Sequence, residues 1–440
     1  MWLEVYMNKT VKSLRIHKIS NKWNRSSLFP LTFIILSILR IGFYFVFSDN
    51  TKGQILPDST EYLALSSNFR EAFLENSPDL LALSIRRPPG YPFILSLLDS
   101  NTFYVGLLQH IMVIALSAIT IALCKILTEN SQIAHAAGIL ILIEPSLFVE
   151  ASVTLSEVAF VFFSTSAIYF TLKVPADQFS LHSSLYAGLL FTAAMFCRPI
   201  GIILILVFLV LLLLNLPRIN WNHITILTLI SVFYGIWVFR NFFLASIPEF
   251  SSQQSHNLHL WEGSGASAFA RNLSIDEVHE FEASLMKSKI GDQPSISEEA
   301  SYRTNRGMYL ILNNFPSFLL MHTVGIGKIL LGPGQGEFMS FVSNGRITRS
   351  SNSLEHLSVY CLALLTILIF AFFVIGFIRS LKSKKDKFLP LNVFLLLNLI
   401  FSSGFQAYSR FRVPISPIMC CYAAIGMWIV YRRLRFRKVT

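Results

Sequence analysis

Isolated carboxylates beside long apolar stretches are the residues of this sequence best suited to chemistry. Asp58 and Glu61 lie in GQILPDSTEYLALSSNF, which follows the apolar stretch LFPLTFIILSILRIGFYFVF. Glu157 lies several residues inside another apolar stretch, where a charged side chain costs about 2.5–3.5 kcal/mol unless it is paired or hydrated. Such a carboxylate can remove a proton from a hydroxyl group as a general base. We take Asp58, Glu61 and Glu157 as the candidate catalytic carboxylates.

A local explanation exists for Asp58. It could cap a short helix, with Glu61 reaching back to the start of that helix. The two interpretations are compatible, because the positive end of a helix, equivalent to about half a unit charge, holds a carboxylate ionised.

Arginines are predicted near the same membrane face as these carboxylates. Guanidinium groups match phosphate oxygens and stay charged, so arginines that face carboxylates at a lipid–water boundary suit an amphiphilic phosphate. The alternative for each of them is an anchor at the end of a span, with its charge in water. The candidate phosphate-binding residues are Arg40, Arg86, Arg87, Arg198, Arg410 and Arg412.

Composition places these residues in a membrane protein. Of the 440 residues, 53% are hydrophobic and 14% are charged, whereas soluble domains carry about 25% charged residues. The net charge of +11 is concentrated in basic clusters at 9–25, 379–387 and 432–438, each beside an apolar stretch. This is the positive-inside pattern, so we predict contact with anionic lipids, cytoplasmic termini and no nucleic-acid partner.

Apolar stretches near the length of about 20 residues needed to cross a bilayer recur along the chain. They predict an all-α polytopic protein with about 10–11 spans. The segment FPSFLLMHTVGIGKILL is either an interfacial helix or the eleventh span. The ten candidate spans are 28–47, 103–127, 132–149, 153–172, 183–198, 199–216, 223–246, 356–379, 389–408 and 413–431.

These spans divide the chain into five regions. The segment 247–355 is expected to be outside and mainly helical, because Ser274 and Ser295 each begin a capping box. We expect the first span to be retained rather than cleaved. The regions are a basic cytoplasmic amino terminus at 1–27, a transmembrane catalytic module at 28–246 with its first outer loop at 48–102, the outer region at 247–355, further spans at 356–431 and a basic cytoplasmic tail at 432–440.

Other motifs carry less chemistry. The five cysteines all lie in apolar stretches and predict no disulfide framework. GPGQG at 332–336 lacks the Lys-Ser/Thr of a phosphate loop and is expected to be a turn. His256 and His259 share one helical face but have no evident third metal ligand. The carboxylates could hold a divalent ion, although no spacing requires one.

Six motifs in order resemble one known family. They are PDSTEYLAL, RRPPGYP, LSEVAF, CRPIG, VFRNFF…NLHLWEG and SRFRVPISP, and the resemblance runs from about Arg40 to Pro417. They are similar to the bacterial branch of the C-type integral-membrane glycosyltransferases, which are related to protein O-mannosyltransferases and to the aminoarabinose transferase of lipid A. The fold that the resemblance implies is the helical membrane bundle of that family.

The resemblance also implies roles for particular residues. Asp58 matches the catalytic base, and Glu61 could share that role because this chain has Asp-Ser-Thr-Glu where family members often have an acid or aromatic residue after the aspartate. Arg87 matches the residue that contacts the lipid phosphate, and Glu157 the second functional acid. Arg410 and Arg412 match the basic late loop. Trp261, together with Asn241, is expected on the acceptor or lid side.

The expected function is therefore sugar transfer from a polyprenyl-phosphate donor, without a nucleotide, to a glycolipid, glycan or protein acceptor. The expected location is a bacterial inner membrane, with the site facing the periplasm or exterior. One alternative is a transporter or flippase of lipid-linked saccharides, which would carry charges through the middle of the membrane. Others are an O-antigen ligase or polymerase and a membrane protein without chemistry.

Overall fold

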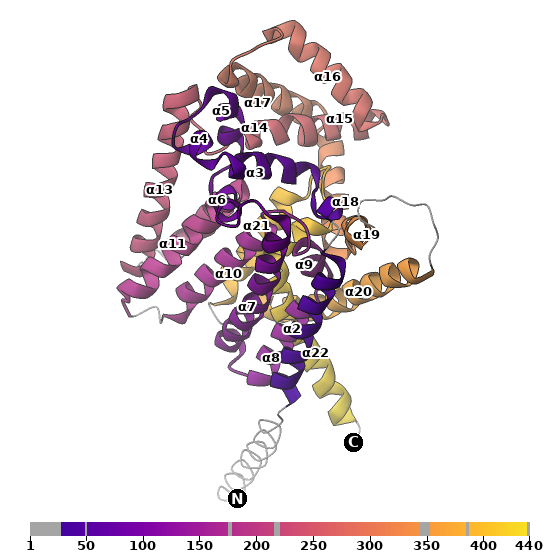
Figure 1. The fold of residues 1–440 in the computed structure, drawn as a ribbon. Coiled ribbons are helices and arrows are strands. Elements are labelled where there is room, and N and C mark those ends of the chain that lie inside the picture. The colour runs from indigo at the N-terminus through magenta and orange to yellow at the C-terminus, as the bar shows by residue number, and fades with distance from the viewer. Residues whose placement is uncertain are drawn as a thin grey trace, which may run out of the picture.

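The computed structural model describes residues 28–48, 51–174, 178–214, 221–342, 353–383 and 387–437, and within these ranges all regular structure is helical. Figure 1 shows a bundle of long helices that carries a layer of shorter helices at one end. The predicted all-α polytopic membrane fold is confirmed. The start of α2 and the end of α22 lie at the opposite end of the bundle from that layer.

Five segments within the described ranges are long and apolar enough to cross a membrane, or six if the bent pair α17–α18 counts as one. The pair consists of α17 (Ile296–Asn313) and α18 (Phe315–Leu331), which meet at 95°. Shorter apolar helices are α8 (Ser131–Ile143), α11 (Leu181–Cys197) and α21 (Phe388–Ser402). The five segments are α2 (Leu28–Phe47), α7 (Thr102–Thr128), α13 (Trp221–Ala245), the part of α20 (Ser353–Leu381) from Leu357, and Ser409–Arg435, which joins η5 (Ser409–Ile415) to α22 (Ser416–Arg437).

Several predicted spans are shorter or broken in the structure. The predicted span 132–149 divides at Pro145 into α8 and α9 (Pro145–Glu150), because proline has no N–H to continue a helix. Glu144 caps the second piece, since its Oε2 accepts a hydrogen bond from the Leu147 amide at 2.7 Å. The predicted span 389–408 ends as a helix at Ser402, and α10 (Glu157–Lys173) begins four residues later than predicted. The predicted segment 199–216 becomes η2 (Pro199–Gly201) and α12 (Ile202–Leu214).

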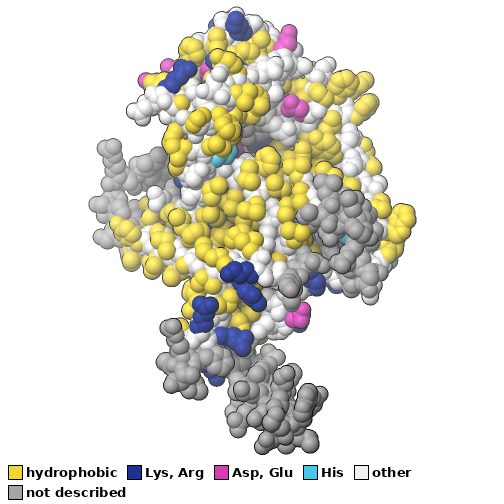
Figure 2. All heavy atoms as spheres, turned by 180° about the vertical axis from the view of Figure 1, so that it is seen from behind, with side chains coloured by type: hydrophobic (Ala, Val, Ile, Leu, Met, Phe, Trp, Pro, Cys, Tyr) yellow, Lys and Arg dark blue, Asp and Glu magenta, His cyan; other side chains and the backbone are white. Residues whose placement is uncertain are grey.

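Burial separates the central helix from the peripheral ones. In the most apolar 18 residues of the Ser409–Arg435 segment, 78% of the residues are buried, against 11% in the corresponding part of α2. Helix α22 packs on α20 and α8, while α10 packs on α11 and α7. Figure 2 shows apolar side chains across the middle of one face, with Lys and Arg side chains gathered at the end where α22 ends. An apolar girdle with basic residues at one rim is what a bilayer requires.

The layer at the other end consists of short helices from two regions. The first outer loop supplies η1 (Thr51–Gln54), α3 (Pro57–Ser67), α4 (Phe69–Phe73), α5 (Pro78–Arg86) and α6 (Gly90–Ser96). The second region supplies α14 (Gln253–Asn257), η4 (Leu258–Gly263), α15 (Ser264–Arg271), α16 (Ile275–Ile290), α17 and, nearer the bundle, α19 (Gln335–Val342). Both predicted capping boxes are present, at Ser274 and Ser295. The layer thus brings loops far apart in sequence to one end of the bundle (Figure 1).

Candidate functional site

The first turns of α3 present two carboxylates to one arginine. The helix begins at Pro57 and the capping residue is Leu56, whose amide donates to the Ser59 hydroxyl at 3.0 Å. The prediction that Asp58 caps this helix is therefore wrong, because the helix begins at Pro57, two residues earlier than a cap at Asp58 requires. Asp58 lies instead in the first turn, where the helix dipole still favours its ionised form.

Arg87 joins the two carboxylates of α3. Its Nη2 lies 2.9 Å from Oδ1 of Asp58, and its Nε lies 2.6 Å from Oε2 of Glu61. Arg86 holds the other oxygen of Glu61 through Nη1 at 3.0 Å. Asp58 and Glu61 are three residues apart, so they share one face of α3 and can meet the same guanidinium group.

Arg410 connects this pair to the membrane helices. Its Nη1 lies 3.0 Å from Oδ2 of Asp58, and its Nε lies 3.6 Å from Oε1 of Glu157. Glu157 is the first residue of α10 and also forms an ion pair with Arg198, which lies between α11 and η2. Five separate segments therefore meet in one group of charges. We call it the acid–arginine cluster: Asp58, Glu61, Glu157, Arg86, Arg87, Arg198 and Arg410.

Aromatic rings hold the guanidinium groups in place. Arg87 lies over the ring of Tyr62 at 5.0 Å, and Arg410 lies over Tyr408 at 4.9 Å and Phe411 at 5.0 Å. Such contacts attract a cation to the ring face and restrict its orientation. The arginines are thus fixed on their hydrophobic sides and meet the carboxylates on their polar sides.

The cluster is open at one side and closed at the other. The Asp58 side chain is 33% exposed, whereas that of Glu157 is 2% exposed. Burial by itself would raise the pKa of Asp58, but the positive charges of Arg410 and Arg87 outweigh it and leave the pKa below its ordinary value. Burial opposes the charged form of Arg87, yet Tyr62, Asp58 and Glu61 hold the pKa of Arg87 above its ordinary value. Asp58 is therefore ionised in the resting protein.

Two predicted phosphate-binding arginines do not join the cluster. Arg412 lies 2.8 Å from Glu144 and donates to the carbonyl groups of Ile329 and Gly332 at the end of α18, at 2.9 and 2.8 Å. Arg40 donates to the carbonyl groups at the α8–α9 break, those of Leu142 and Leu147. Both arginines are 2% exposed. Their guanidinium groups hydrogen-bond to carbonyl groups where the helices break at Pro145 and end at Gly332. The prediction from sequence that both arginines belong to the phosphate-binding group is thereby corrected.

The two predicted lid residues lie in different parts of the fold, Trp261 in the short-helix layer and Asn241 near the end of the long helix α13. Asn241 is fully buried and donates to the carbonyl groups of Glu249 and Phe250 at 3.0 and 3.1 Å, which ties the end of α13 to the next loop. Trp261 lies in η4 and packs against His279 of α16 and Phe405, with ring centroids 5.3 and 6.5 Å away. Trp261 therefore lies over the loop that leads to Arg410, while Asn241 supports the backbone.

Sequence reasoning missed Glu150, although it lies in the same stretch as Glu157, EPSLFVEASVTLSEVAF. Its side chain is 1% exposed, and among the described residues its Oε2 has no hydrogen-bond partner. Helix α9 packs against η5, α10 and α19, so Glu150 lies within reach of the charges of Arg410 and Glu157. The sequence feature that could have identified Glu150 is the presence of a third carboxylate between Glu144 and Glu157.

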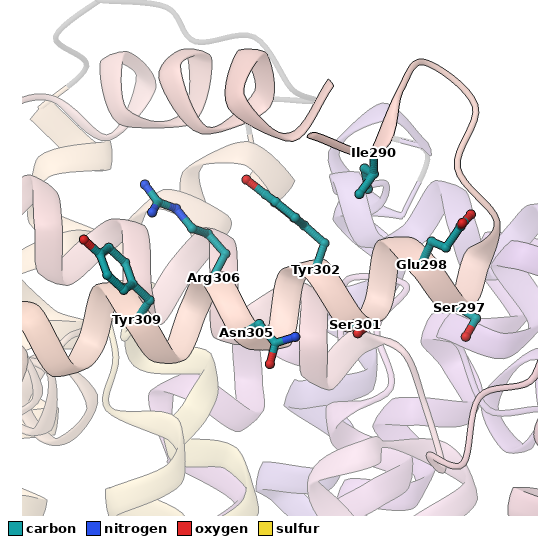
Figure 3. A pocket seen from close by; sticks show the side chains of 8 residues that line it. All are labelled: Ile290, Ser297, Glu298, Ser301, Tyr302, Asn305, Arg306 and Tyr309. Carbon is teal, nitrogen blue, oxygen red and sulfur yellow. The ribbon is translucent and has the colours of Figure 1, made fainter. Parts of the chain in front are cut away.

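A shallow hollow lies elsewhere, on the outer helices (Figure 3). Tyr302, Arg306 and Tyr309 rise from one side of α17 toward α16. The other lining residues are Ile290, Ser297, Glu298, Ser301 and Asn305. Close to it, Glu282 accepts hydrogen bonds from Arg306 at 2.8 and 2.7 Å and contacts His259 at 3.1 Å. Over the part of the chain that the structure describes, no group of three or more His, Cys, Asp or Glu could hold a metal ion.

The fold is that of the C-type integral-membrane glycosyltransferases. It matches the apo oligosaccharyltransferase of Archaeoglobus fulgidus with a TM-score of 0.52 and 13% identity over 95% of this chain. The chain spans about half of that protein, 52% of its length. The structure of ArnT from Cupriavidus metallidurans bound to undecaprenyl phosphate is less similar, with a TM-score of 0.37 and 11% identity over 91% of this chain and 77% of the other.

A family model identifies part of the chain more closely. Residues 77–262 match the family described as dolichyl-phosphate-mannose-protein mannosyltransferase. The relation to O-mannosyltransferases that the motifs predicted is thereby confirmed. No curated protein matches the chain.

Proposed function

We propose that this protein transfers a sugar from a polyprenyl-phosphate donor to a hydroxyl-bearing acceptor. The observation that supports this most is the position of Arg410 between Asp58 and Glu157. This position joins the candidate base to guanidinium groups suited to a phosphate, which supports the proposal. The description of the matched family, which names a dolichyl-phosphate sugar, supports the class of donor.

In the proposed reaction, Asp58 removes the proton from the acceptor hydroxyl as the oxygen attacks the anomeric carbon. The bond between that carbon and the phosphate oxygen breaks, and its electron pair leaves with the lipid phosphate. Arg87, Arg410 and Arg198 stabilise the negative charge that develops on the leaving group, which is where fixed positive charges accelerate a reaction most. Asp58 afterwards releases its proton to water at the open side of the cluster.

The proposed orientation places the cluster on the extracytoplasmic side of a bacterial inner membrane. The described basic residues at 432–435 end α22, at the opposite end of the bundle from the short-helix layer (Figure 1). Basic residues favour the cytoplasmic side, so the layer and the cluster would face outward. The isoprenoid tail would then lie between the membrane helices, and the acceptor, a glycolipid, glycan or protein, would approach past Trp261.

Transfer assays on membranes test the proposal directly. Membranes that contain the protein should transfer labelled sugar from a polyprenyl-phosphate donor, and Asp58→Asn should abolish transfer while the protein still inserts. Asp79→Asn, which removes an exposed aspartate of α5 in the same loop, is the matched control and should transfer normally. Normal transfer by Asp58→Asn would remove Asp58 from its role as the base.

Dependence on a divalent ion can be tested in the same assay. Each carboxylate of the cluster contacts at least one guanidinium group, which competes with a metal ion for the same oxygens. We therefore expect transfer to continue after chelation with EDTA. Loss of transfer that Mg²⁺ or Mn²⁺ restores would instead assign a metal ion to these carboxylates.

A further inference from the structure

Three buried polar atoms without a hydrogen-bond partner occur on the closed side of the acid–arginine cluster. They are Oε2 of Glu150, Nη1 of Arg198 and Nε of Arg410, each unpartnered among the residues that the structure describes. The two arginine nitrogens contact Glu157 as ion pairs, but neither forms an aligned hydrogen bond with it. Leaving a buried donor or acceptor unsatisfied costs about 1–3 kcal/mol. Glu157 compensates the charge of the two arginine nitrogens, so the uncompensated group is the Glu150 carboxyl, and a ligand bound beside it would complete its hydrogen bond.

The surroundings of Glu150 determine which form of its carboxyl group is present. Glu157 takes the direct contacts with Arg198 and Arg410, whereas Glu150 forms no ion pair within the described ranges. Burial raises the pKa of Glu150 well above its ordinary value, and the neighbouring charge of Glu157 raises it further. Two nearby carboxyl groups in a buried site do not both ionise readily. Glu157 keeps its ion pairs with Arg198 and Arg410, and Glu150 is therefore held in its neutral form.

A neutral carboxylic acid has an O–H group to donate, which an ionised carboxylate does not have. We propose that Glu150 binds the donor as a neutral acid, donating a hydrogen bond to the phosphate oxygen that Arg198 and Arg410 face. This inference rests on the proposed function, because it assumes that a lipid phosphate occupies the cluster. It assigns to Glu150 a contact with the phosphate that an ionised carboxylate could not make, because the two negative charges would repel each other.

The test is equilibrium binding of undecaprenyl phosphate to the purified full chain in nanodiscs, with undecaprenol as the lipid without phosphate. Glu150→Ala should weaken binding about tenfold, the loss expected for one hydrogen bond to a charged group. Glu150→Gln should bind within about threefold of the wild type, because its amide can still donate. Glu280→Gln, an exposed glutamate of α16, is the matched control. Wild-type affinity in Glu150→Ala, or equal weakening in Ala and Gln, would overturn the inference.

The pH dependence of binding distinguishes a neutral Glu150 from one that is ionised at every pH. Between pH 7.5 and 10 a phosphate monoester is already doubly ionised, since its second pKa is about 6. The affinity of the wild type relative to that of Glu150→Gln should fall at the pH at which Glu150 loses its proton, because only the wild type acquires a negative charge there. Wild-type binding more than about threefold weaker than that of Glu150→Gln at pH 7.5 would contradict the neutral acid, because an ionised carboxylate repels the phosphate while the amide does not. Thermal unfolding and gel filtration check that each variant is folded.

Arg410→Ala distinguishes failure of this inference from failure of the proposed function. If Arg410→Ala weakens binding and the Glu150 variants do not, the inference about Glu150 is wrong and the proposed function stands. If Arg410→Ala also binds undecaprenyl phosphate as the wild type does, the cluster is not a phosphate site and both proposals fail.

Discussion

Arg410 and Asp58 are 352 positions apart in sequence, yet Nη1 of the arginine lies 3.0 Å from Oδ2 of the aspartate. The contact joins the first outer loop to the segment that precedes the last helix. It also restrains the candidate base, because a carboxylate paired with two guanidinium groups is a poor proton acceptor. An incoming phosphate would compete with Asp58 for Arg410 and Arg87. We infer that donor binding makes Asp58 more basic.

The first prediction concerns the pH profile of transfer. The lowered pKa of Asp58 should keep kcat/KM, measured at low donor concentration, constant to below the ordinary carboxylate range. With saturating donor, the phosphate competes for the arginines and adds negative charge, so the acid limb of kcat should lie at higher pH. Activity falls as pH decreases through each pKa, since the base must be ionised. Acid limbs at the same pH in both profiles would contradict release of Asp58 by the donor.

The second prediction concerns Arg87. Arg87→Ala should weaken undecaprenyl phosphate binding by tenfold or more, and Arg87→Lys should bind with intermediate affinity because an ammonium group cannot contact Asp58 and Glu61 with the geometry of a guanidinium fork. The measurement is lipid binding in nanodiscs. Arg70→Ala is the matched control, because Arg70 lies in the same outer loop and pairs only with exposed Glu75. Equal affinities for wild type and Arg87→Ala would place the phosphate elsewhere.

The third prediction concerns Glu157. Glu157→Gln leaves Arg198 and Arg410 without their shared negative partner, so a phosphate should be attracted more strongly. We expect tighter binding of undecaprenyl phosphate together with slower turnover, because the lipid phosphate product would leave slowly. Steady-state kinetics and product inhibition measure the two effects. Weaker product binding in Glu157→Gln would show that Glu157 helps to hold the lipid rather than to release it.

Sequence alone predicted which loops meet but not which side chain of each loop takes part. The motifs around Asp58, Arg87 and Glu157 were expected at one membrane face, and the fold brings them together. Arg410 and Arg412 could not be separated, since both lie in SRFRVPISP. In the structure they lie in a 3-10 turn with three residues per turn, so residues two apart point in different directions. Arg410 reaches the acid–arginine cluster, whereas Arg412 reaches Glu144.

The break between α8 and α9 accounts for a second difference. A continuous span 132–149 would leave Glu150 at its end, whereas the break at Pro145 turns α9 against η5 and buries that carboxyl group. Such a redirection depends on tertiary packing, because a proline in an apolar stretch predicts a kink but not its direction. The catalytic and binding roles of these residues stay predictions.

The fourth prediction separates supporting arginines from phosphate-binding ones. Arg412→Met should destabilise the fold by about 3–5 kcal/mol, because it leaves Glu144 buried without its partner. It should leave the affinity for undecaprenyl phosphate unchanged under conditions in which the protein stays folded. Denaturant unfolding in detergent and lipid binding in nanodiscs measure the two quantities. A large loss of affinity in folded Arg412→Met would return Arg412 to the phosphate site that its motif predicted.

The last prediction concerns the outer helices, where Glu282 of α16 joins His259 of η4 to Arg306 of α17. Burial alone would raise the pKa of Glu282, but hydrogen bonds from Arg306 and His259 outweigh it and lower the pKa to about 2. A lowered pKa contributes stability that is present above the unfolded value, about 4.3, and is lost as pH falls toward about 2. The protection of α16 amides against hydrogen exchange, relative to their intrinsic rate at each pH, should therefore fall over that range.

Two variants check the assignment. Glu282→Gln should exchange faster than the wild type at neutral pH and lose the pH dependence below about 4.3, because the titrating carboxylate is gone. Glu280→Gln changes an exposed glutamate of the same helix and should keep the wild-type profile. If the acid-induced loss of protection persists in Glu282→Gln, another group controls the docking of α16. His279 of α16 packs against Trp261. Loss of α16 docking at low pH would therefore also release Trp261, the aromatic residue expected to cover the site.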